Sequence, residues 1–299
     1  MEVVVYGAGS LGSLLGGLLA RTHEVTLVGR DPHVTAVRNS GLQVVGIETF
    51  ETVPRATTGG TGLEGDLALV AVKAYDTPTA ARELATGEFD AVLSVQNGMG
   101  NEEILAEGLP CPVLAGITSH GAIHTGPGVV EWTGRGEVTV GPWRGAGTDV
   151  AERAGAAFRK AGVETTVGTE VRTRLWEKLA VNAAINPTTA LARMRNGGVF
   201  AGPTAECART AARETALVAR ASGVELTDER AIERARTVAR ETGGNRSSMY
   251  QDVLAGKRTE VDAVSGFVAD RADREGLDAP VNRVFRALIR GWEAAEGVR

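Results

Sequence analysis

The 299-residue sequence has little cysteine, little lysine and few aromatic residues, and it lacks any long apolar run. Its two cysteines, Cys111 and Cys207, lie outside any paired motif, which fits a reduced compartment and excludes a disulfide framework. No apolar run approaches the roughly 18 residues that a membrane span needs. The chain opens directly with a strand pattern, EVVVYG, with neither a basic segment nor a cleavage site, so we expect a cytoplasmic protein.

An excess of positive charge is also missing. The 32 Lys and Arg residues oppose 37 Asp and Glu residues, and the net charge of −5 argues against a nucleic-acid partner. His120 and His124 are four residues apart, but no carboxylate or cysteine lies near them in a glycine-punctuated segment, so we expect no metal site. We also expect no membrane partner, and the oligomeric state, monomer or homodimer, stays open.

The first half of the sequence alternates between strand and helix patterns. Nearly continuous apolar segments, typical of parallel strands buried on both faces, occur at residues 2–7, 24–30, 66–74 and 91–98. Helical patterns fall between the strands at residues 10–21, 78–85 and 101–108. This rhythm is typical of a doubly wound sheet. Residues 112–122 and 129–142 predict shorter strands with glycine turns, which we expect at the sheet edge.

From about residue 169 the pattern becomes entirely helical. Helical segments separated by glycine or proline occur at residues 172–187, 204–223, 228–242 and 282–296. We therefore predict an α/β protein with two domains. An N-terminal Rossmann-type doubly wound domain, residues 1–168, binds a nucleotide, and an all-helical C-terminal domain, residues 169–299, follows it.

The motif GAGSLG places three glycines in G-x-G-x-x-G spacing between the first strand and the first helix. Gly7 allows a tight turn, Gly9 lets a pyrophosphate approach the backbone, and Gly12 lets the helix lie close to the strand. The phosphates would then meet free N–H groups at a helix N-terminus. The motif thus predicts a dinucleotide site made by Gly7, Ala8, Gly9, Ser10, Leu11 and Gly12.

The end of the second strand indicates which dinucleotide binds. NAD enzymes usually carry Asp or Glu there to bind the ribose hydroxyls, whereas this strand ends at Arg30. A guanidinium suits a 2′-phosphate, and Lys73, at the end of another strand, could add a second cation. Alternatively, both cations are surface charges and Asp31 is the ribose-binding acid. We predict NADP rather than NAD.

Asn97, in the segment SVQNG, follows another predicted strand, at the sheet edge where ligands bind in open α/β folds. Asn-Gly is also a common turn dipeptide. A turn and a contact to nicotinamide and substrate are both compatible with this position.

The segment WEKLAVNAAINPTTAL (176–191) is mostly apolar but carries Lys178, Asn182 and Asn186 at four-residue spacing. On a helix these side chains share one face over about 12 Å. Pro187 removes a backbone donor, so we expect the helix to kink or end there. Spacing alone leaves two interpretations: a structural stripe satisfied by internal hydrogen bonds, or the wall of a ligand-filled cleft.

A second polar cluster lies at residues 245–262. Asn245, Ser247 and Ser248 stand where a helix would start, and a serine or asparagine could cap it. Glu260 precedes an apolar segment. It either caps the next helix, with Thr259 in the first turn, or has a functional role.

Together, GAGSLG, VAVKAYDT, SVQNGMGNEE, WEKLAVNAAINPTTAL and NRSSMYQDVLAGKRTEVDAVSG resemble the ketopantoate reductase family (2-dehydropantoate 2-reductases). The resemblance covers essentially the whole chain, and K-L-A-x-N-x-x-I-N-P and S-M-x-Q-D-x-x-x-G-x-x-T-E-x-D are more specific than the glycine loop. It implies an oxidoreductase that reduces 2-dehydropantoate to (R)-pantoate with NADPH, in pantothenate and coenzyme A synthesis. The helical domain would then bind substrate and carry the catalytic groups.

The resemblance also implies roles for individual residues. Lys178 matches the catalytic lysine, which would hydrogen-bond the ketone oxygen and act as general acid, and Glu260 matches the substrate-binding acid. The matches to substrate-binding residues are Asn97, Asn182, Asn186, Asn196, Asn245 and Ser248. The matches to cofactor contacts are Arg30, Lys73, Asn97 and Ala122.

One segment departs from the family pattern. In LARMRNGGVF (191–200), Arg193 and Arg195 flank Met194 where many members have a hydrophobic Pro-Asn-Gly segment, so the match at Asn196 is the least direct. This departure favours one alternative function, reduction of another branched 2-oxo acid on the same fold. A second alternative is a non-catalytic NADP-binding regulator, although a sensor has no need of a proton donor such as Lys178.

Overall fold

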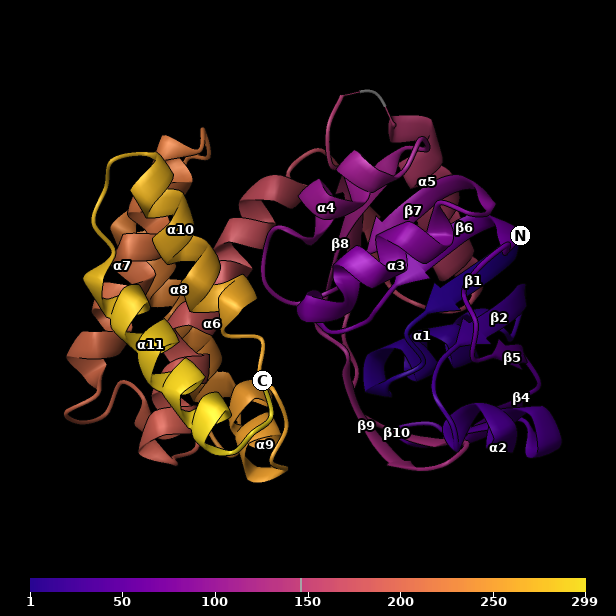
Figure 1. The fold of residues 1–299 in the computed structure, drawn as a ribbon, viewed down its shortest axis with the longest axis horizontal. Helices are drawn as coiled ribbons and strands as arrows, with labels where there is room; N and C mark the ends of the chain where they lie inside the picture. Colours follow the sequence, from indigo (N-terminus) through magenta and orange to yellow (C-terminus); the bar gives the residue numbers. More distant parts are fainter. Residues whose placement is uncertain (146) are drawn as a thin grey trace. The chain divides into compact units, whose positions relative to one another are not determined.

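The computed structural model describes residues 1–145 and 147–299, which form two compact units (Figure 1). The first unit comprises Met1–Gln96 and Asn101–Val171, and the second comprises Asn97–Gly100 and Arg172–Arg299. In the described residues, no helix combines the length and the apolar character needed to cross a membrane.

The first unit is built on an eight-stranded sheet of order β12-β11-β8-β7-β6-β1-β2-β5. Its strands in chain order are β1 (Glu2–Tyr6), β2 (Glu24–Val28), β5 (Arg55–Thr57), β6 (Glu64–Val70), β7 (Glu88–Ser94), β8 (Val113–Thr118), β11 (Val138–Pro142) and β12 (Thr165–Val167). Neighbouring strands are parallel except for β8 and β11. The predicted doubly wound, Rossmann-type sheet is therefore confirmed.

In the described part of the chain, five helices accompany this sheet, of which the first, third and fourth match predicted helical segments and the other two were not predicted. They are α1 (Ser10–Leu19), α2 (His33–Ser40), α3 (Thr77–Leu84), α4 (Asn101–Gly108) and α5 (Thr148–Lys160), with a 3-10 turn η1 (Ala74–Asp76) before α3. Leu14, Leu15 and Leu18 of α1 are buried in one core with Val5 and Leu27 of the strands. Burial of this apolar face, at about 25 cal/mol per Å², fixes α1 against the sheet.

A second, four-stranded sheet of order β4-β3-β10-β9 was not predicted. It consists of β3 (Leu42–Gly46), β4 (Phe50–Thr52), β9 (Gly121–Gly126) and β10 (Val129–Gly134). The expectation that residues 112–142 lie at the main-sheet edge is wrong for β9 and β10, which leave that sheet. It is also wrong for β8 and β11, because β12 is the edge strand beyond them. Pairing between strands far apart in sequence, such as β3 with β10, leaves no local pattern to detect.

The second unit is helical, as predicted, and no described residue after Val167 forms a strand. Its helices are α6 (Val171–Ala192), α7 (Ala205–Ala221), α8 (Asp228–Glu241), α9 (Ser248–Leu254), α10 (Phe267–Arg274) and α11 (Pro280–Ala295), with a 3-10 turn η2 (Asn196–Gly198) and a π-helix η3 (Asp262–Gly266). In Figure 1, α11 (yellow) lies beside α7 and α10.

Pro187 lies inside α6, which goes on to Ala192, so the prediction that the helix could end at the proline is wrong. In the turn that contains the proline, the Thr189 hydroxyl donates to the carbonyl oxygens of Ile185, at 2.8 Å, and Asn186, at 3.0 Å. The whole turn is buried. Tertiary packing therefore outweighs the proline penalty of about 3 kcal/mol.

Candidate active site

Three neighbouring parallel strands, β6, β1 and β2, end at the same edge of the main sheet. The glycine loop (residues 7–12) follows β1, Arg30 follows β2 and Lys73 follows β6. Because parallel strands bring their carboxyl ends together, the fold places all three predicted cofactor elements along one edge.

The three glycines of the loop have different surroundings. Gly7 has φ +113°, and a Cβ there would lie 2.7 Å from Val72 N. A Cβ on Gly12 would lie 2.0 Å from Gly7 O. The fold itself thus requires glycine at both positions. At Gly9, in contrast, φ is −84° and a Cβ would meet no heavy atom within 4 Å, so the folded chain leaves open space where a ligand can approach the backbone.

The N-terminus of α1 faces this loop. The Ser13 N–H donates to Gly9 O at 2.9 Å, whereas the N–H groups one turn earlier have no intrahelical acceptor and favour an anion. Ser10 Oγ accepts the backbone N–H of His124 at 3.0 Å. This bond brings β9, the strand of Ala122, next to the glycine loop.

Arg30 has an 87% exposed side chain, and its Nη2 donates to Asp76 Oδ2 at 3.0 Å. Asp76 ends η1, and its N–H donates to Lys73 O at 2.8 Å, so Arg30 and Lys73 share one neighbourhood. Asp31 Oδ1 accepts both the N–H and the hydroxyl of Thr35, at 3.1 and 2.7 Å. This carboxylate is thus engaged at the start of α2, which disfavours the alternative in which Asp31 binds the ribose.

Sequence reasoning missed a histidine cluster behind the loop. His33, 5% exposed, has its Nε2 3.0 Å from Ser13 Oγ of α1 and its Nδ1 2.8 Å from His124 Nε2. The Gly128 N–H also donates to His33 Nδ1, at 3.0 Å, so we assign the ring proton to Nε2, which then donates to Ser13. Burial, together with the neighbouring His124, lowers the pKa of His33 to about 4. The neutral ring ties α1, the start of α2 and the β9–β10 turn together.

Lys178, Asn182 and Asn186 all lie on α6 and share one of its faces, as predicted. Asn186 is 7% exposed, and the other two side chains are half-buried. In the described part of the chain, no residue hydrogen-bonds the side-chain amide of Asn182 or Asn186. The purely structural interpretation required such bonds. A water or a ligand must satisfy these amides instead, because leaving them unpaired is costly.

The second polar cluster lies next to the end of this stripe. Ser247 caps α9 as predicted, with its Oγ accepting the Tyr250 N–H at 3.1 Å. The same Oγ lies 2.6 Å from Thr189 Oγ1, which is three residues after Asn186. Ser248, the exposed first residue of α9, is thereby held near the stripe.

Asn196 has a more structural setting than the other asparagines. Its N–H donates to Asn245 O at 3.0 Å, and its Nδ2 donates to Thr242 Oγ1 at 2.9 Å. Its buried Oδ1 has no partner among the described residues. Asn196 therefore fastens η2 to the turn that carries the exposed Asn245, and it offers only its amide oxygen to a ligand.

Glu260 is buried between Thr259 and η3. The N-cap position of η3 falls on Val261, whose N–H donates to Thr259 Oγ1 at 3.2 Å. Thr259 therefore provides one side-chain acceptor in this turn, and the capping role of Glu260 stays a prediction.

Asn97 lies in a four-residue segment, Asn97–Gly100, that belongs to the second unit. The Met99 N–H donates to Ala263 O of η3 at 2.9 Å. Gly98 has φ +79°, and a Cβ there would lie 2.6 Å from Ala263 Cβ, so only glycine fits this turn. The segment is therefore a turn, and it is docked on the element that follows Glu260.

Gln96, directly before Asn97, was overlooked in the sequence although it belongs to the same SVQNG motif. It is buried, and its Nε2 donates to Val72 O at 3.0 Å and to Thr77 Oγ1 at 2.7 Å. It fastens the end of β7 to the segment that carries Lys73. A polar residue at a buried strand end was the available signal.

The candidate residues divide cleanly between the two units. The eight proposed catalytic and substrate-binding residues all lie in the second unit, and the proposed cofactor residues other than Asn97 lie in the first. Across residues 1–145 and 147–299, no group of three or more His, Cys, Asp and Glu could hold a metal ion.

Comparison with known proteins places this arrangement among enzymes. Residues 3–145 match the family described as ketopantoate reductase PanE/ApbA, and residues 170–293 match its C-terminal part. The chain is 45% identical to a 2-dehydropantoate 2-reductase of Halobacterium salinarum, over 97% of this chain and 98% of the relative.

Solved structures agree. A PanE/ApbA family ketopantoate reductase from Ralstonia eutropha superposes with a TM-score of 0.91 at 34% identity, covering 99% of this chain and all of that one. D-mandelate dehydrogenase, solved with NADH and anilino(oxo)acetate, superposes with a TM-score of 0.93 over the full length of both chains. Because the two sequences are only 23% identical, this similarity shows a common fold and no more. The sequence matches, the fold and the shared coverage together show that the chain belongs to the ketopantoate reductase family of oxidoreductases.

Proposed function

We propose that this protein reduces 2-dehydropantoate to (R)-pantoate with NADPH, a step in pantothenate and coenzyme A synthesis. One observation carries the substrate site: Asn182 and Asn186 lie on a largely buried helix, yet no described residue hydrogen-bonds their amides. Groups so placed are satisfied by a ligand or by the water that it displaces. Family membership supplies the reaction class.

The first unit fits a dinucleotide. Gly9 leaves space for a pyrophosphate beside the free N–H groups of α1, and Ala8, Ser10 and Leu11 complete the loop. NADPH, when bound, supplies the hydride for C2 of the substrate. Arg30 would exchange its exposed ion pair with Asp76, worth about 0–1 kcal/mol, for the 2′-phosphate, and Lys73 would assist. Ala122 and Asn97 would also contact the cofactor.

The second unit supplies the chemistry. The Lys178 ammonium donates a hydrogen bond to the ketone oxygen, stabilises the negative charge that develops there, and gives up its proton as general acid. Glu260 accepts the substrate's terminal hydroxyl. Asn182 and Asn186 fix the carbon chain, with the Asn196 amide oxygen nearby.

Asn245 and Ser248 take the substrate's carboxylate. We assign cofactor binding to the domain at residues 1–168, and substrate binding and catalysis to the domain at residues 169–299. Residues 97–100 assist the second domain. A cytoplasmic location and a monomeric or homodimeric state remain predictions.

A spectrophotometric assay of 2-dehydropantoate with NADPH and with NADH tests this proposal. Substrate-dependent loss of NADPH absorbance is expected, with slower turnover of NADH. Lys178→Ala should lower kcat by about 10²–10⁴-fold, the usual contribution of a general acid, while NADPH binding measured by fluorescence stays within about twofold. Wild-type turnover in that variant would refute the mechanism.

Reduction of another branched 2-oxo acid is the second candidate function. The altered segment favours it, because Arg195 Nη1 donates to Gly244 O beside Asn245, and Arg193 has an unusual φ of +52°. A panel comparing kcat/KM for 2-dehydropantoate with simpler branched 2-oxo acids separates the two. Saturable NADPH binding without oxidation by any 2-oxo acid would instead indicate the non-catalytic regulator.

A further inference from the structure

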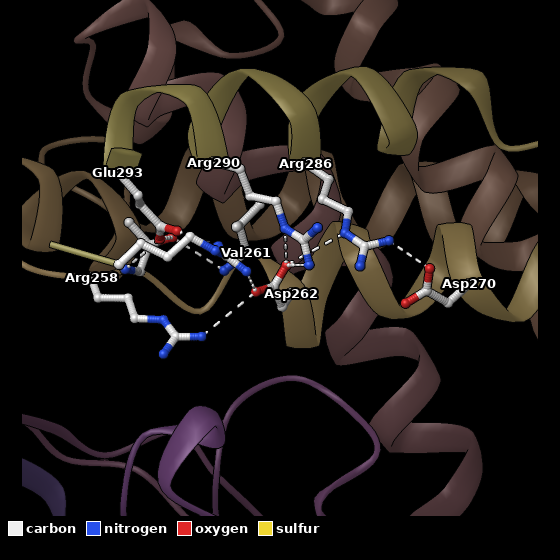
Figure 2. A network of polar contacts seen from close by, with 9 residues as sticks. Arg258, Val261, Asp262, Asp270, Arg286, Arg290 and Glu293 are labelled. Carbon is white, nitrogen blue, oxygen red and sulfur yellow. Dashed lines mark hydrogen bonds and ion pairs between the residues drawn. The ribbon is translucent and has the colours of Figure 1, made fainter. Parts of the chain in front are cut away.

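The loop that carries Glu260 is held by a network of charged side chains that the mechanism above does not use (Figure 2). On one side stands Glu293, a fully buried residue of α11. Its Oε1 accepts the N–H of Thr259 at 2.8 Å and the Thr259 hydroxyl at 2.7 Å. Because Thr259 directly precedes Glu260, these two bonds fix the backbone before the carboxylate.

On the other side stands Asp262, two residues after Glu260. Its Oδ1 accepts a hydrogen bond from Arg290 Nε at 2.7 Å, Arg290 Nη2 forms an ion pair with it at 2.7 Å, and Arg286 Nε lies 3.4 Å away. Figure 2 shows both arginines reaching Asp262 from α11. Burial alone would raise the pKa of Asp262, but hydrogen bonds from Arg290 and Arg299 outweigh it and hold the pKa below its usual range. Asp262 is therefore ionised at neutral pH.

Arg299 joins the two sides. Its Nη1 donates to Glu293 Oε2 and its Nη2 donates to Asp262 Oδ2, each at 2.7 Å. A planar guanidinium presents these donors at a fixed separation, so it sets the spacing of the two carboxylates that flank Glu260. A lysine at this position has a single nitrogen and has no such fixed fork.

The same segment also seats the turn of Asn97. Ala263 follows Asp262 and accepts the Met99 N–H at 2.9 Å. The segment continues as the π-helix η3, a rare geometry that tends to occur at functional sites. Whatever fixes residues 259–263 thus fixes both Glu260 and the turn that carries Asn97.

We propose that Arg299, acting through Glu293 and Asp262, is a positioning residue that sets the placement of Glu260 and Asn97 for the substrate. This inference rests on the proposed function, because it takes Glu260 as the substrate-binding acid. Arg299 acts through the two carboxylates, so its loss should misplace existing contacts rather than remove one.

Steady-state kinetics of Arg299→Ala and Arg299→Lys test the proposal, with Arg283→Ala as the matched control. Arg283 also lies on α11, but its ion pair with Asp273 is exposed. Arg299→Ala should raise the KM for 2-dehydropantoate about tenfold and leave the KM for NADPH within about twofold. Arg299→Lys should recover only part of the loss, and Arg283→Ala should match the wild type.

Should Arg299→Ala fold poorly, Thr259→Val takes its place, because it keeps the shape of the side chain and removes one hydrogen bond to Glu293. It should shift the KM for 2-dehydropantoate in the same direction by about threefold. An unchanged KM in the folded variants, or an equal rise in the KM values for both substrates, would overturn the positioning role alone. A wild-type protein inactive on 2-dehydropantoate would overturn the proposed function, and this inference with it.

Discussion

The two units hold the segments that carry the candidate site residues with different electrostatics. In the first, the neutral ring of His33 joins the glycine-loop helix to the start of α2 and to Gly128. In the second, formal charges on Glu293, Asp262 and Arg299 hold the Glu260 segment. Both arrangements need deprotonated groups, but the reference pKa values are about 6.5 for histidine and 3.9 for aspartate. Mild acid should therefore loosen the first unit before the second.

Removing one charge from the ionic network should have the largest effect on stability. Glu293→Gln removes the charge of a fully buried carboxylate, but its partner Arg299 is 31% exposed, so the loss should stay below the about 3–5 kcal/mol of a fully buried pair. Thermal and urea unfolding should report this loss. Glu206→Gln is the control, because the Glu206–Arg209 pair is exposed and its loss should leave the stability nearly unchanged. Equal losses in the two variants would show that the second unit does not depend on its buried charges.

The neutral network should show its effect as pH dependence. The pKa of His33 falls from 6.5 to about 4 on folding. Its contribution is complete above pH 6.5 and is lost as the pH falls toward 4, because only the unfolded state takes up the proton in that window. The shift corresponds to at most about 3 kcal/mol.

Unfolding free energies of the wild type and His33→Gln, measured between pH 7 and pH 4.5, check this expectation. The variant keeps an amide donor for Ser13 but cannot titrate, so its pH slope should be shallower. Equal pH slopes of the unfolding free energy in the two proteins would show that His33 does not cause the pH dependence. A steep loss of stability that starts only below pH 4 would assign it to carboxylates instead.

The smallest expected effect on stability is that of Arg30→Ala, which tests whether this residue serves cofactor binding rather than the fold of the first unit. Arg30→Ala removes an exposed ion pair of the first unit, so stability should change by less than about 1 kcal/mol. Loss of charge-assisted hydrogen bonds to a 2′-phosphate should weaken the binding of NADPH by about 1.5–3 kcal/mol and leave the binding of NADH nearly unchanged. Fluorescence titration with both cofactors measures the difference. A parallel loss for NADPH and NADH would assign Arg30 to a structural role.

Features with a local pattern could be predicted from the sequence. The strand and helix periods gave the doubly wound sheet and the helical second unit, and the glycine spacing gave distinct roles to Gly7, Gly9 and Gly12. The cap of α9, Ser247, is one of the three polar residues at which the sequence predicted a helix start. Each of these depends on residues within one turn or one strand of each other.

Features that depend on distant residues could not be predicted. His33 meets His124 across 91 residues, and Glu293 meets Thr259 across 34. Neither contact produces a periodic pattern in the sequence, and the pairing of β3 with β10 could not be predicted for the same reason. Pro187 shows the opposite failure, in which a strong local signal is outweighed by the burial of the surrounding turn.

The placement of Asn97–Gly100 has a consequence for how such proteins can recombine. The chain passes between the units at residues 96/97, 100/101 and 171/172, so its two halves are not separate modules. A hybrid joined near residue 171 would set the turn of one parent against the η3 of the other, where Gly98 leaves no room for mismatch. A hybrid of two relatives should therefore be more stable when residues 97–100 and the helical unit come from the same parent.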